Sequence, residues 1–382
     1  MLEAVTSGNG YPLKLSPPAG HRARQPRLAR GICLTHSVIL MACLLACAPL
    51  DGRSKGPAAA GGVHATSGAA LAPTDSPAPT VDALRIIYSG TGGSYIPLWV
   101  AADGGYFREQ TLDAELLLIE SGTLATQTLV AGEAPLANIA AAAVLGAMVE
   151  GFDAAFVQAT VNVSPQALFV RNDLAVPAGL RGGRVGITRF GSSTDVIARL
   201  LLGRWGLDPE RDVTLLQVGS VPDVLAALQT GAVDAGMLAD PTSLQAMKLG
   251  LRSAADAAEL GIPYLHLGTV APRAVIGSRP DLVRRYLLAY QAGLDRFFAD
   301  AAVSEQVLAK YTHQDDPEVL HGTYQVYAEK YISQDVRPRP ETLAPILATA
   351  SSPRAREVAP ESLIDDLPVR QLQADGLLPI RR

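Results

Sequence analysis

The sequence of 382 residues is 48% hydrophobic and 18% charged, and its formal net charge is −5. This composition is that of a globular protein, and the length allows two modest domains or one domain of two lobes. The charge is uneven, since residues 48–382 hold 27 basic and 36 acidic residues, a net charge of −9. Because an acidic body lacks the basic surface that phosphate backbones select, we expect no nucleic-acid partner.

An export signal is predicted at residues 1–46. Basic residues up to Arg30 precede an apolar run at 31–46, which is the order of the n-region and h-region of such a signal. The run is shorter than the ~20 residues of a transmembrane helix. It ends in the letters LLAC at Cys47, and this end resembles the bacterial lipoprotein signal, in which the cysteine carries lipid. A weaker match at Cys43, an ordinary signal peptide and a retained anchor helix are the alternatives.

Residues 47–82 are predicted to form a flexible tether. They are mostly Ala, Gly, Pro, Ser and Thr, with few large apolar side chains to offset the entropy of ordering. Lipid on Cys47 would therefore hold a globular body at a membrane, in the periplasm or at the cell surface. All three cysteines lie at or before Cys47, so we expect neither a disulfide nor thiol chemistry in the body.

The body begins with alternating strands and helices. Short β-branched or aliphatic runs at 84–89 and 114–120 predict strands. A helix is predicted from Tyr95 to the glycines at 104–105, and a second one at 121–132. This order is typical of parallel sheets covered by helices, which is the α/β class.

The second half of the body repeats the arrangement. Strands are predicted at 182–188 and 212–218, and helices at 191–206 and 220–231. The segments LVAGEAPLANIA and LQTGAVDAGMLAD also resemble each other, each with a helix end, a glycine turn and a short strand. Two similar α/β lobes are therefore expected, with a ligand cleft where their strand ends and helix starts face each other.

Several of these segments together resemble one family of solute-binding proteins. They are YSGTGGSYIPLWVAADGGYF, SGTLATQTLVAGEAPLANIA, LRGGRVGIT, GSSTD, WGLDPERDVTLLQVG, ALQTGAVDAGMLADPT and, near the end, PESLIDDLPVRQLQADGLL. The chain is similar to the nitrate, sulfonate and taurine type, which is related to the binders of thiamin-pyrimidine precursors. The resemblance implies a two-lobed, type II periplasmic-binding-protein-like fold, each lobe a mostly parallel sheet covered by helices. It places lobe 1 at 83–172 and 269–382, and lobe 2 at 173–268.

The same resemblance implies the function. Such proteins bind a small polar or anionic organic molecule and deliver it to the permease and ATPase subunits of an ABC importer. We expect a monomer that uses no cofactor and binds no metal. A sensor lipoprotein that reports to a membrane receptor is an alternative that the sequence does not separate from transport.

The turns after the predicted strands supply the first candidate ligand contacts. Thr91, Gly92 and Ser94 lie between a strand end and a helix start, where free amides and the helix dipole favour an anion or a carbonyl group. The matching turn of the second lobe offers Ser193 and Thr194, while Ser192 and Asp195 suffice as a helix cap. A plain strand-to-helix turn is the alternative at both places.

The remaining candidates differ in chemistry. Tyr95 and Phe190 could stack on a flat ligand, whereas Trp99 is assigned to the core. Arg189 could pair with an anionic group, and the carboxylate of Asp240 with an amine, although capping explains Asp240 equally well. The whole candidate set is Thr91, Gly92, Ser94, Tyr95, Ser121, Thr123, Asn138, Arg189, Phe190, Ser193, Thr194 and Asp240.

Enzyme activity is not expected. The export segment holds every cysteine, which excludes a cysteine nucleophile in the body, and no Gly-x-Ser-x-Gly elbow is present. His313 and His321 lie eight residues apart without an obvious third metal ligand. A thiamin-pyrimidine synthase-like enzyme is the alternative from the same superfamily, and the export signal and few lysines argue against it.

Overall fold

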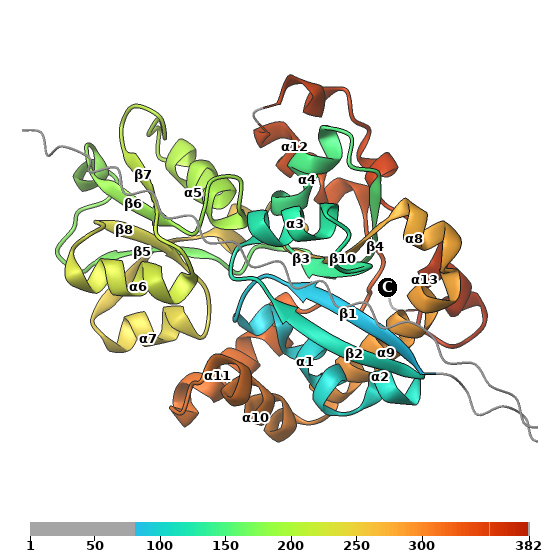
Figure 1. The fold of residues 1–382 in the computed structure, drawn as a ribbon. Coiled ribbons are helices and arrows are strands. Elements are labelled where there is room, and N and C mark those ends of the chain that lie inside the picture. The colour runs from blue at the N-terminus through green and yellow to red at the C-terminus, as the bar shows by residue number, and fades with distance from the viewer. Residues whose placement is uncertain (1–80, 351, 381–382) are drawn as a thin grey trace, which may run out of the picture. The chain divides into compact units, whose positions relative to one another are not determined.

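The computed structural model describes residues 81–350 and 352–380. The predicted export signal, Cys47 and nearly all of the predicted tether lie outside the described residues. The described chain forms two five-stranded sheets, each covered by helices on both faces (Figure 1). The predicted α/β fold of two lobes is confirmed. No helix of this part of the chain is long and apolar enough to cross a membrane.

The first sheet has the strand order β2-β1-β3-β10-β4. Strand β1 is parallel to β2 and β3, and β10 is antiparallel to β3 and β4, so the sheet is mixed. The strands are β1 (Asp82–Tyr88), β2 (Leu112–Leu118), β3 (Leu136–Ile139), β4 (Ala154–Val161) and β10 (Leu267–Pro272).

Side chains of β1 alternate between two hydrophobic cores, as the two-residue period of a strand requires. Leu84 and Ile86 pack on one face, and Ile87 on the other. The first face is covered by α1 (Ile96–Asp103), α2 (Tyr106–Glu109) and α9 (Pro280–Ala299), and the second by α3 (Gly122–Val130), α4 (Ala141–Val149) and α12 (Ala344–Thr349).

The second sheet has the order β7-β6-β8-β5-β9 and is also mixed. Strand β6 is parallel to β7 and β8, whereas β5 is antiparallel to β8 and β9. Helix α5 (Ser193–Arg204) packs on one face, and α6 (Val221–Thr230) and α7 (Thr242–Lys248) on the other. The strands are β5 (Ala167–Arg171), β6 (Arg184–Ile187), β7 (Thr214–Gln217), β8 (Ala235–Leu238) and β9 (Leu251–Asp256).

Two chain crossings join the lobes. The first runs through 162–166, between β4 and β5, and the second through 257–266, between β9 and β10. The second lobe therefore begins before residue 173, which is the boundary expected from the sequence. The difference arises because β5 pairs with β8 and β9 in the second sheet, and a short apolar strand does not reveal which sheet it joins.

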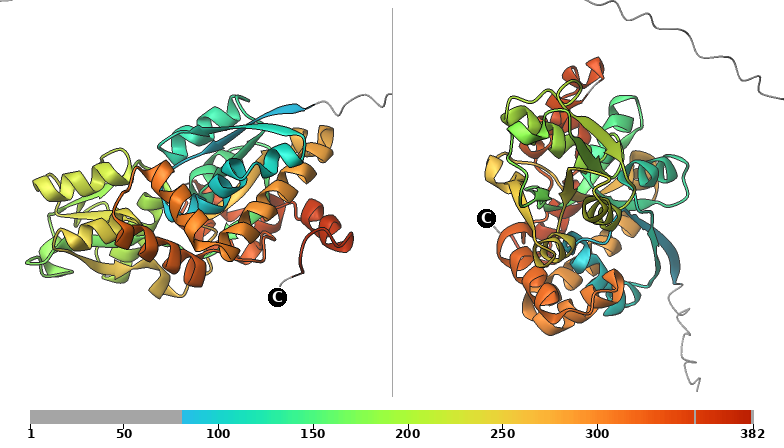
Figure 2. Two further views of the ribbon diagram at one scale, coloured as in Figure 1. Left: turned by 90° about the horizontal axis from the view of Figure 1, so that it is seen from below. Right: turned by 90° about the vertical axis from the view of Figure 1, so that its left-hand side faces the viewer.

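The chain after the second crossing returns to the first lobe. Helix α10 packs on α1, and α13 on α9 and β4, while α11 also contacts α7 of the second lobe. In the left view of Figure 2, seen from below, the orange helices α9, α10 and α11 lie one after another. The helices of this part are α8 (Arg273–Ser278), α10 (Ala301–Thr312), α11 (Pro317–Val326) and α13 (Leu367–Ala374), with a π-helical turn at Tyr327–Tyr331.

Short 3-10 turns connect the larger elements. They lie at Gly93–Tyr95, Ala178–Leu180, Ala257–Leu260, Pro340–Thr342, Pro353–Arg356 and Pro360–Leu363.

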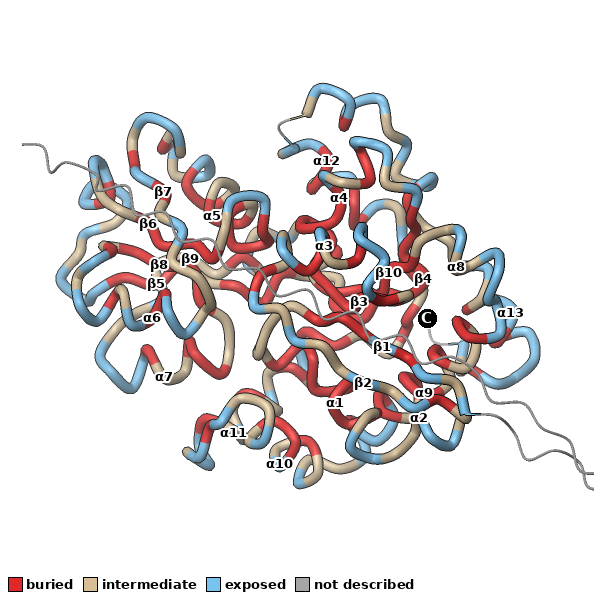
Figure 3. Tube along the Cα trace, in the orientation of Figure 1, coloured by how far each residue is buried: buried red, intermediate tan, exposed pale blue. Residues whose placement is uncertain are grey.

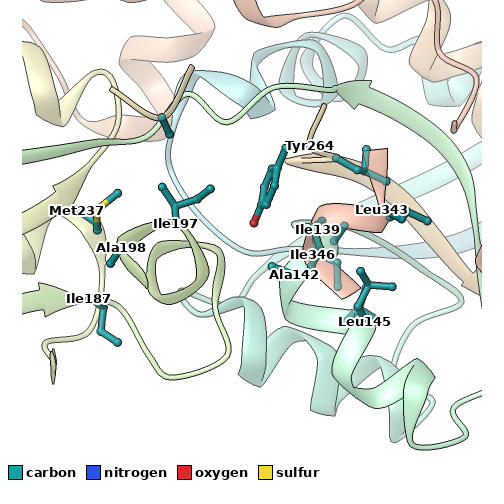
Figure 4. Packing of buried hydrophobic residues seen from close by; sticks show 14 of the residues in the cluster. Ile139, Ala142, Leu145, Ile187, Ile197, Ala198, Met237, Tyr264, Leu343 and Ile346 are labelled. Carbon is teal, nitrogen blue, oxygen red and sulfur yellow. The ribbon is translucent and has the colours of Figure 1, made fainter. Parts of the chain in front are cut away.

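Burial is highest in the strands and in the helix faces that cover them (Figure 3). One hydrophobic cluster contains residues of both lobes. Figure 4 shows the ring of Tyr264, from the second crossing, between Ile197 of α5 and Ile139 and Ile346 of the first lobe. The two lobes are therefore packed against each other.

Candidate ligand-binding site

A cavity of about 100 Å³ lies where helix starts of both lobes meet. The first lobe contributes the turn after β1 and the start of α3, and the second lobe the starts of α5, α6 and α7. Seven of the candidate residues line it, namely Thr91, Gly92, Ser94, Tyr95, Ser121, Ser193 and Thr194. Strand ends and helix starts of an α/β sheet thus form the cavity, as the sequence pattern predicts.

The turn after β1 is held by close packing. A Cβ atom added to Gly93 would lie 2.5 Å from two ring carbons of Tyr327 and 3.0 Å from a methyl carbon of Thr323. The amide of Gly93 donates a hydrogen bond to the carbonyl oxygen of Asp240, at 3.1 Å, across the two lobes. A residue without a side chain is needed here, because the backbone approaches both an aromatic ring and the opposite lobe.

Tyr95 supplies an aromatic wall to the cavity. Its ring is buried beside Tyr88 and Trp99, and its hydroxyl lies 3.0 Å from Oγ of Ser89. Burial raises the pKa of Tyr95 to about 12, so the hydroxyl stays protonated at neutral pH. Trp99 is fully buried and stacks on Tyr311, in agreement with its assignment to the core.

Hydrogen bonds hold the start of α5. Ser192 Oγ accepts a hydrogen bond from the amide of Asp195, and a carboxylate oxygen of Asp195 accepts one from the amide of Gly191 at 2.8 Å. The hydroxyl of Thr194 accepts from the amide of Thr188 at 2.9 Å and lies 2.8 Å from the hydroxyls of Thr188 and Ser192. Ser192 and Asp195 therefore form the expected cap, and the Thr194 hydroxyl is occupied within the turn.

Ser193 is placed differently. Its hydroxyl lies 3.3 Å from Oε1 of Gln166, 3.4 Å from the hydroxyl of Tyr264 and 3.4 Å from Nδ1 of His266. These distances are longer than the ~2.7–2.8 Å that O–H···O hydrogen bonds prefer. Because Gln166 belongs to the first crossing, and Tyr264 and His266 to the second, Ser193 connects the second lobe to both crossings while its hydroxyl remains loosely bound.

His266 and Tyr327 line the cavity although the sequence analysis did not select them. Burial lowers the pKa of His266 to about 3, so its imidazole is neutral at neutral pH. Tyr327 is fully buried, and its hydroxyl has no hydrogen-bond partner within the described residues. No sequence pattern marks either residue, because tertiary packing alone brings the second crossing and the turn after α11 to the cavity.

The sequence model described as NMT1/THI5 like matches residues 93–302, which is more than half of the chain. The chain belongs to the NMT1/THI5-like family. No curated protein matches the sequence.

Solved structures share the fold of this family member at low sequence identity. A Bordetella bronchiseptica RB50 protein has a TM-score of 0.68 at 22% identity, covering 77% of this chain and 98% of that protein. The periplasmic aliphatic sulphonate binding protein SsuA from Escherichia coli has a TM-score of 0.58 at 20% identity, covering 76% of this chain and 91% of that protein. The periplasmic nitrate-binding protein NrtA from Synechocystis PCC 6803 has a TM-score of 0.60 at 14% identity, covering 79% of this chain and 92% of that protein. These likenesses show the periplasmic-binding-protein fold.

Five candidate residues of this NMT1/THI5-like protein do not line the cavity. Thr123 donates a hydrogen bond to the carbonyl oxygen of Phe190 at 3.2 Å, and the Phe190 side chain is 47% exposed. Asn138 is buried in the first sheet, where its amide donates to the hydroxyl of Thr269 at 3.1 Å. Arg189 is half-buried beside the α5 turn, and the carboxylate of Asp240 accepts a hydrogen bond from Ser243.

Ion pairs also join the two lobes of this family member. Lys248, at the end of α7, lies 2.5 Å from a carboxylate oxygen of Asp316 and 2.7 Å from one of Glu318, at the start of α11. Lys330 lies 3.3 Å from the carboxylate of Asp256. Together with the Gly93 and Thr123 hydrogen bonds, they connect the two lobes. No group of three side chains that could hold a metal ion occurs among residues 81–350 and 352–380.

Proposed function

We propose that the protein captures a small polar organic molecule outside the cytoplasm and delivers it to an ABC importer. The observation that carries this proposal is the hydroxyl-rich cavity, to which both lobes contribute helix starts. A ligand held from both sides would stabilise the closed arrangement of the lobes. The fold shared with sulfonate-binding and nitrate-binding proteins supports the same function.

Binding is favoured over catalysis by the environment of Ser193 and His266. A serine near a histidine is the arrangement of a hydrolase, but these atoms are 3.4 Å apart, which is a long contact. Burial keeps the pKa of His266 at about 3, far below that of an effective general base at neutral pH. Among the described residues, His266 donates no hydrogen bond to a carboxylate, so the pair lacks the third group that orients a catalytic histidine.

A lipid on Cys47 would keep the binding protein near its importer, and this part of the proposal rests on the sequence alone. The expected result of Cys47→Ser is release of the protein from membranes into the soluble fraction, with unchanged thermal unfolding of the body. Stable attachment requires more than one acyl chain, which a lipoprotein cysteine carries. Retention of the variant in washed membranes, with no lipid mass on the wild-type protein, would contradict this anchor.

The function is tested by ligand capture and by uptake. Native mass spectrometry of the isolated protein should find a bound small molecule, and X-ray scattering should show closure when that molecule is added to the stripped protein. Deletion of the gene should abolish uptake of the same molecule. Normal uptake after deletion, together with a lost cellular response to the molecule, would favour the sensor function instead. Chemical turnover of the bound molecule would favour an enzyme of the thiamin-pyrimidine synthase type.

A further inference from the structure

The one charged side chain that lines the cavity, among the described residues, is acidic. Among the described residues that line it, none is Lys or Arg, and Glu120 is the charged one. Glu120 is exposed and lines the cavity, and its carboxylate makes no hydrogen bond or ion pair within the described chain. His266 adds no positive charge, because burial lowers its pKa to about 3. A bound anion would therefore meet a negative charge without a basic side chain to offset it.

The helix starts that face the cavity already have carboxylates of their own. Glu120 directly precedes Ser121, the N-cap of α3. Asp195 accepts a hydrogen bond from the amide of Gly191 at the start of α5. Asp223 accepts from both the amide and the hydroxyl of Ser220 at the start of α6, at 2.8 and 2.7 Å. These carboxylates occupy part of the donors that an anion would use at a helix start, and Asp195 also forms an ion pair with Arg199 at 2.7 Å.

Tyr327 provides an unpartnered polar group at the same cavity. Its ring is fully buried and fixed against Gly93 and Thr323, and the residue lines the cavity. Its hydroxyl lies near the Ser94 side chain but has no hydrogen bond of good geometry within the described residues. Burial and the nearby carboxylate of Asp240 raise the pKa of Tyr327, so the hydroxyl stays protonated. A buried polar group without a partner destabilises the protein, and a ligand that pairs with it would remove this cost.

We infer that the ligand is a small organic molecule that carries N–H donors and no anionic group, with one polar atom on the Tyr327 hydroxyl and a donor on Glu120. The inference rests on the proposed function and narrows its ligand class. Oε1 of Gln166 and the Ser193 hydroxyl add further hydrogen-bonding groups at the cavity. The carboxylates disfavour nitrate and sulfonates, the anions that the helix starts alone would favour.

Calorimetry on the full chain tests this ligand class. The probes are 2-aminoethanol, acetamide, ethanesulfonate and nitrate, at equal concentration and pH 7. The amine or the amide should bind, and the two anions should not. Tyr327→Phe removes the hydroxyl and keeps the ring, and Glu120→Gln removes the charge; each should weaken binding at least fivefold. Glu133→Gln, at an exposed site beyond the end of α3, is the matched control and should leave binding unchanged.

The outcomes separate the ligand class from the function. Tighter binding of ethanesulfonate or nitrate than of the amine and the amide would overturn the inference and leave a solute-binding protein. Unchanged binding in both Tyr327→Phe and Glu120→Gln would overturn it as well. If no probe binds and no small molecule accompanies the isolated protein in native mass spectrometry, the proposed function fails and the inference fails with it.

Discussion

The two lobes place their turns at the cavity by different physical means. In the first lobe, the turn after β1 is fixed by packing, with Gly93 against the ring of Tyr327. In the second lobe, hydrogen bonds among Thr188, Ser192, Thr194 and Asp195 fix the turn before α5. The first turn is thus sensitive to side-chain volume, and the second to the loss of single polar atoms. Two lobes of similar topology can therefore differ in which substitutions their ligand-facing turns tolerate.

The largest effect is expected from Gly93→Ala, which tests the packing of the first lobe. The added methyl group would lie 2.5 Å from the ring of Tyr327 and should lower the free energy of unfolding by about 3 kcal/mol, since overpacking a filled site forces side chains out of their rotamers. Thermal unfolding measures the change. Gly146→Ala is the control, because open space surrounds Gly146 on α4 and alanine favours a helix. Equal melting temperatures for the two variants would show that the ring of Tyr327 moves at little cost to make room for the methyl group.

Thr194→Val tests the hydrogen-bonded turn of the second lobe. It keeps the shape of the side chain but leaves the amide of Thr188 without its partner, so we expect a loss of about 2 kcal/mol in the free energy of unfolding. Ser193→Ala is the matched comparison, because its contacts of 3.3–3.4 Å are weak. That variant should unfold nearly as the wild type does and bind the ligand more weakly. Urea denaturation separates the two, and a larger stability loss in Ser193→Ala would reverse our assignment of the two hydroxyls.

Helix caps allow a direct comparison between the lobes. Ser220 and Asp223 cap α6 reciprocally, whereas Ser121 caps α3 through one contact of 3.4 Å to the amide of Leu124. Ser220→Ala should therefore cost about 1 kcal/mol of unfolding free energy, and Ser121→Ala less. Chemical denaturation of both variants checks the order. A greater loss in Ser121→Ala would mean that the first lobe also depends on its polar contacts.

The smallest effect is expected where the lobes meet through ion pairs. Lys248→Ala removes the contacts to Asp316 and Glu318 and should weaken the contact between the lobes only slightly, because exposed pairs contribute little. Ligand affinity at low salt should fall by about twofold, and the difference should vanish at high salt. Lys310→Ala, which breaks a pair with Asp103 inside the first lobe, should leave affinity unchanged. The same loss in both variants would assign the effect to general charge instead of closure.

The sequence by itself determined the repeated order of strands and helices, the caps and the turns. The short β-branched run at 84–89, the Ser192 and Ser220 caps and the glycine turns are local patterns, so the α/β class and seven of the cavity residues could be predicted from them. Only the tertiary structure decided which sheet β5 joins, because strand pairing depends on partners far away in the chain. It also decided that Tyr327 and His266 reach the cavity, and that Asn138 and Phe190 do not line it. These placements follow from packing between distant segments, which leaves no periodic signal in the sequence.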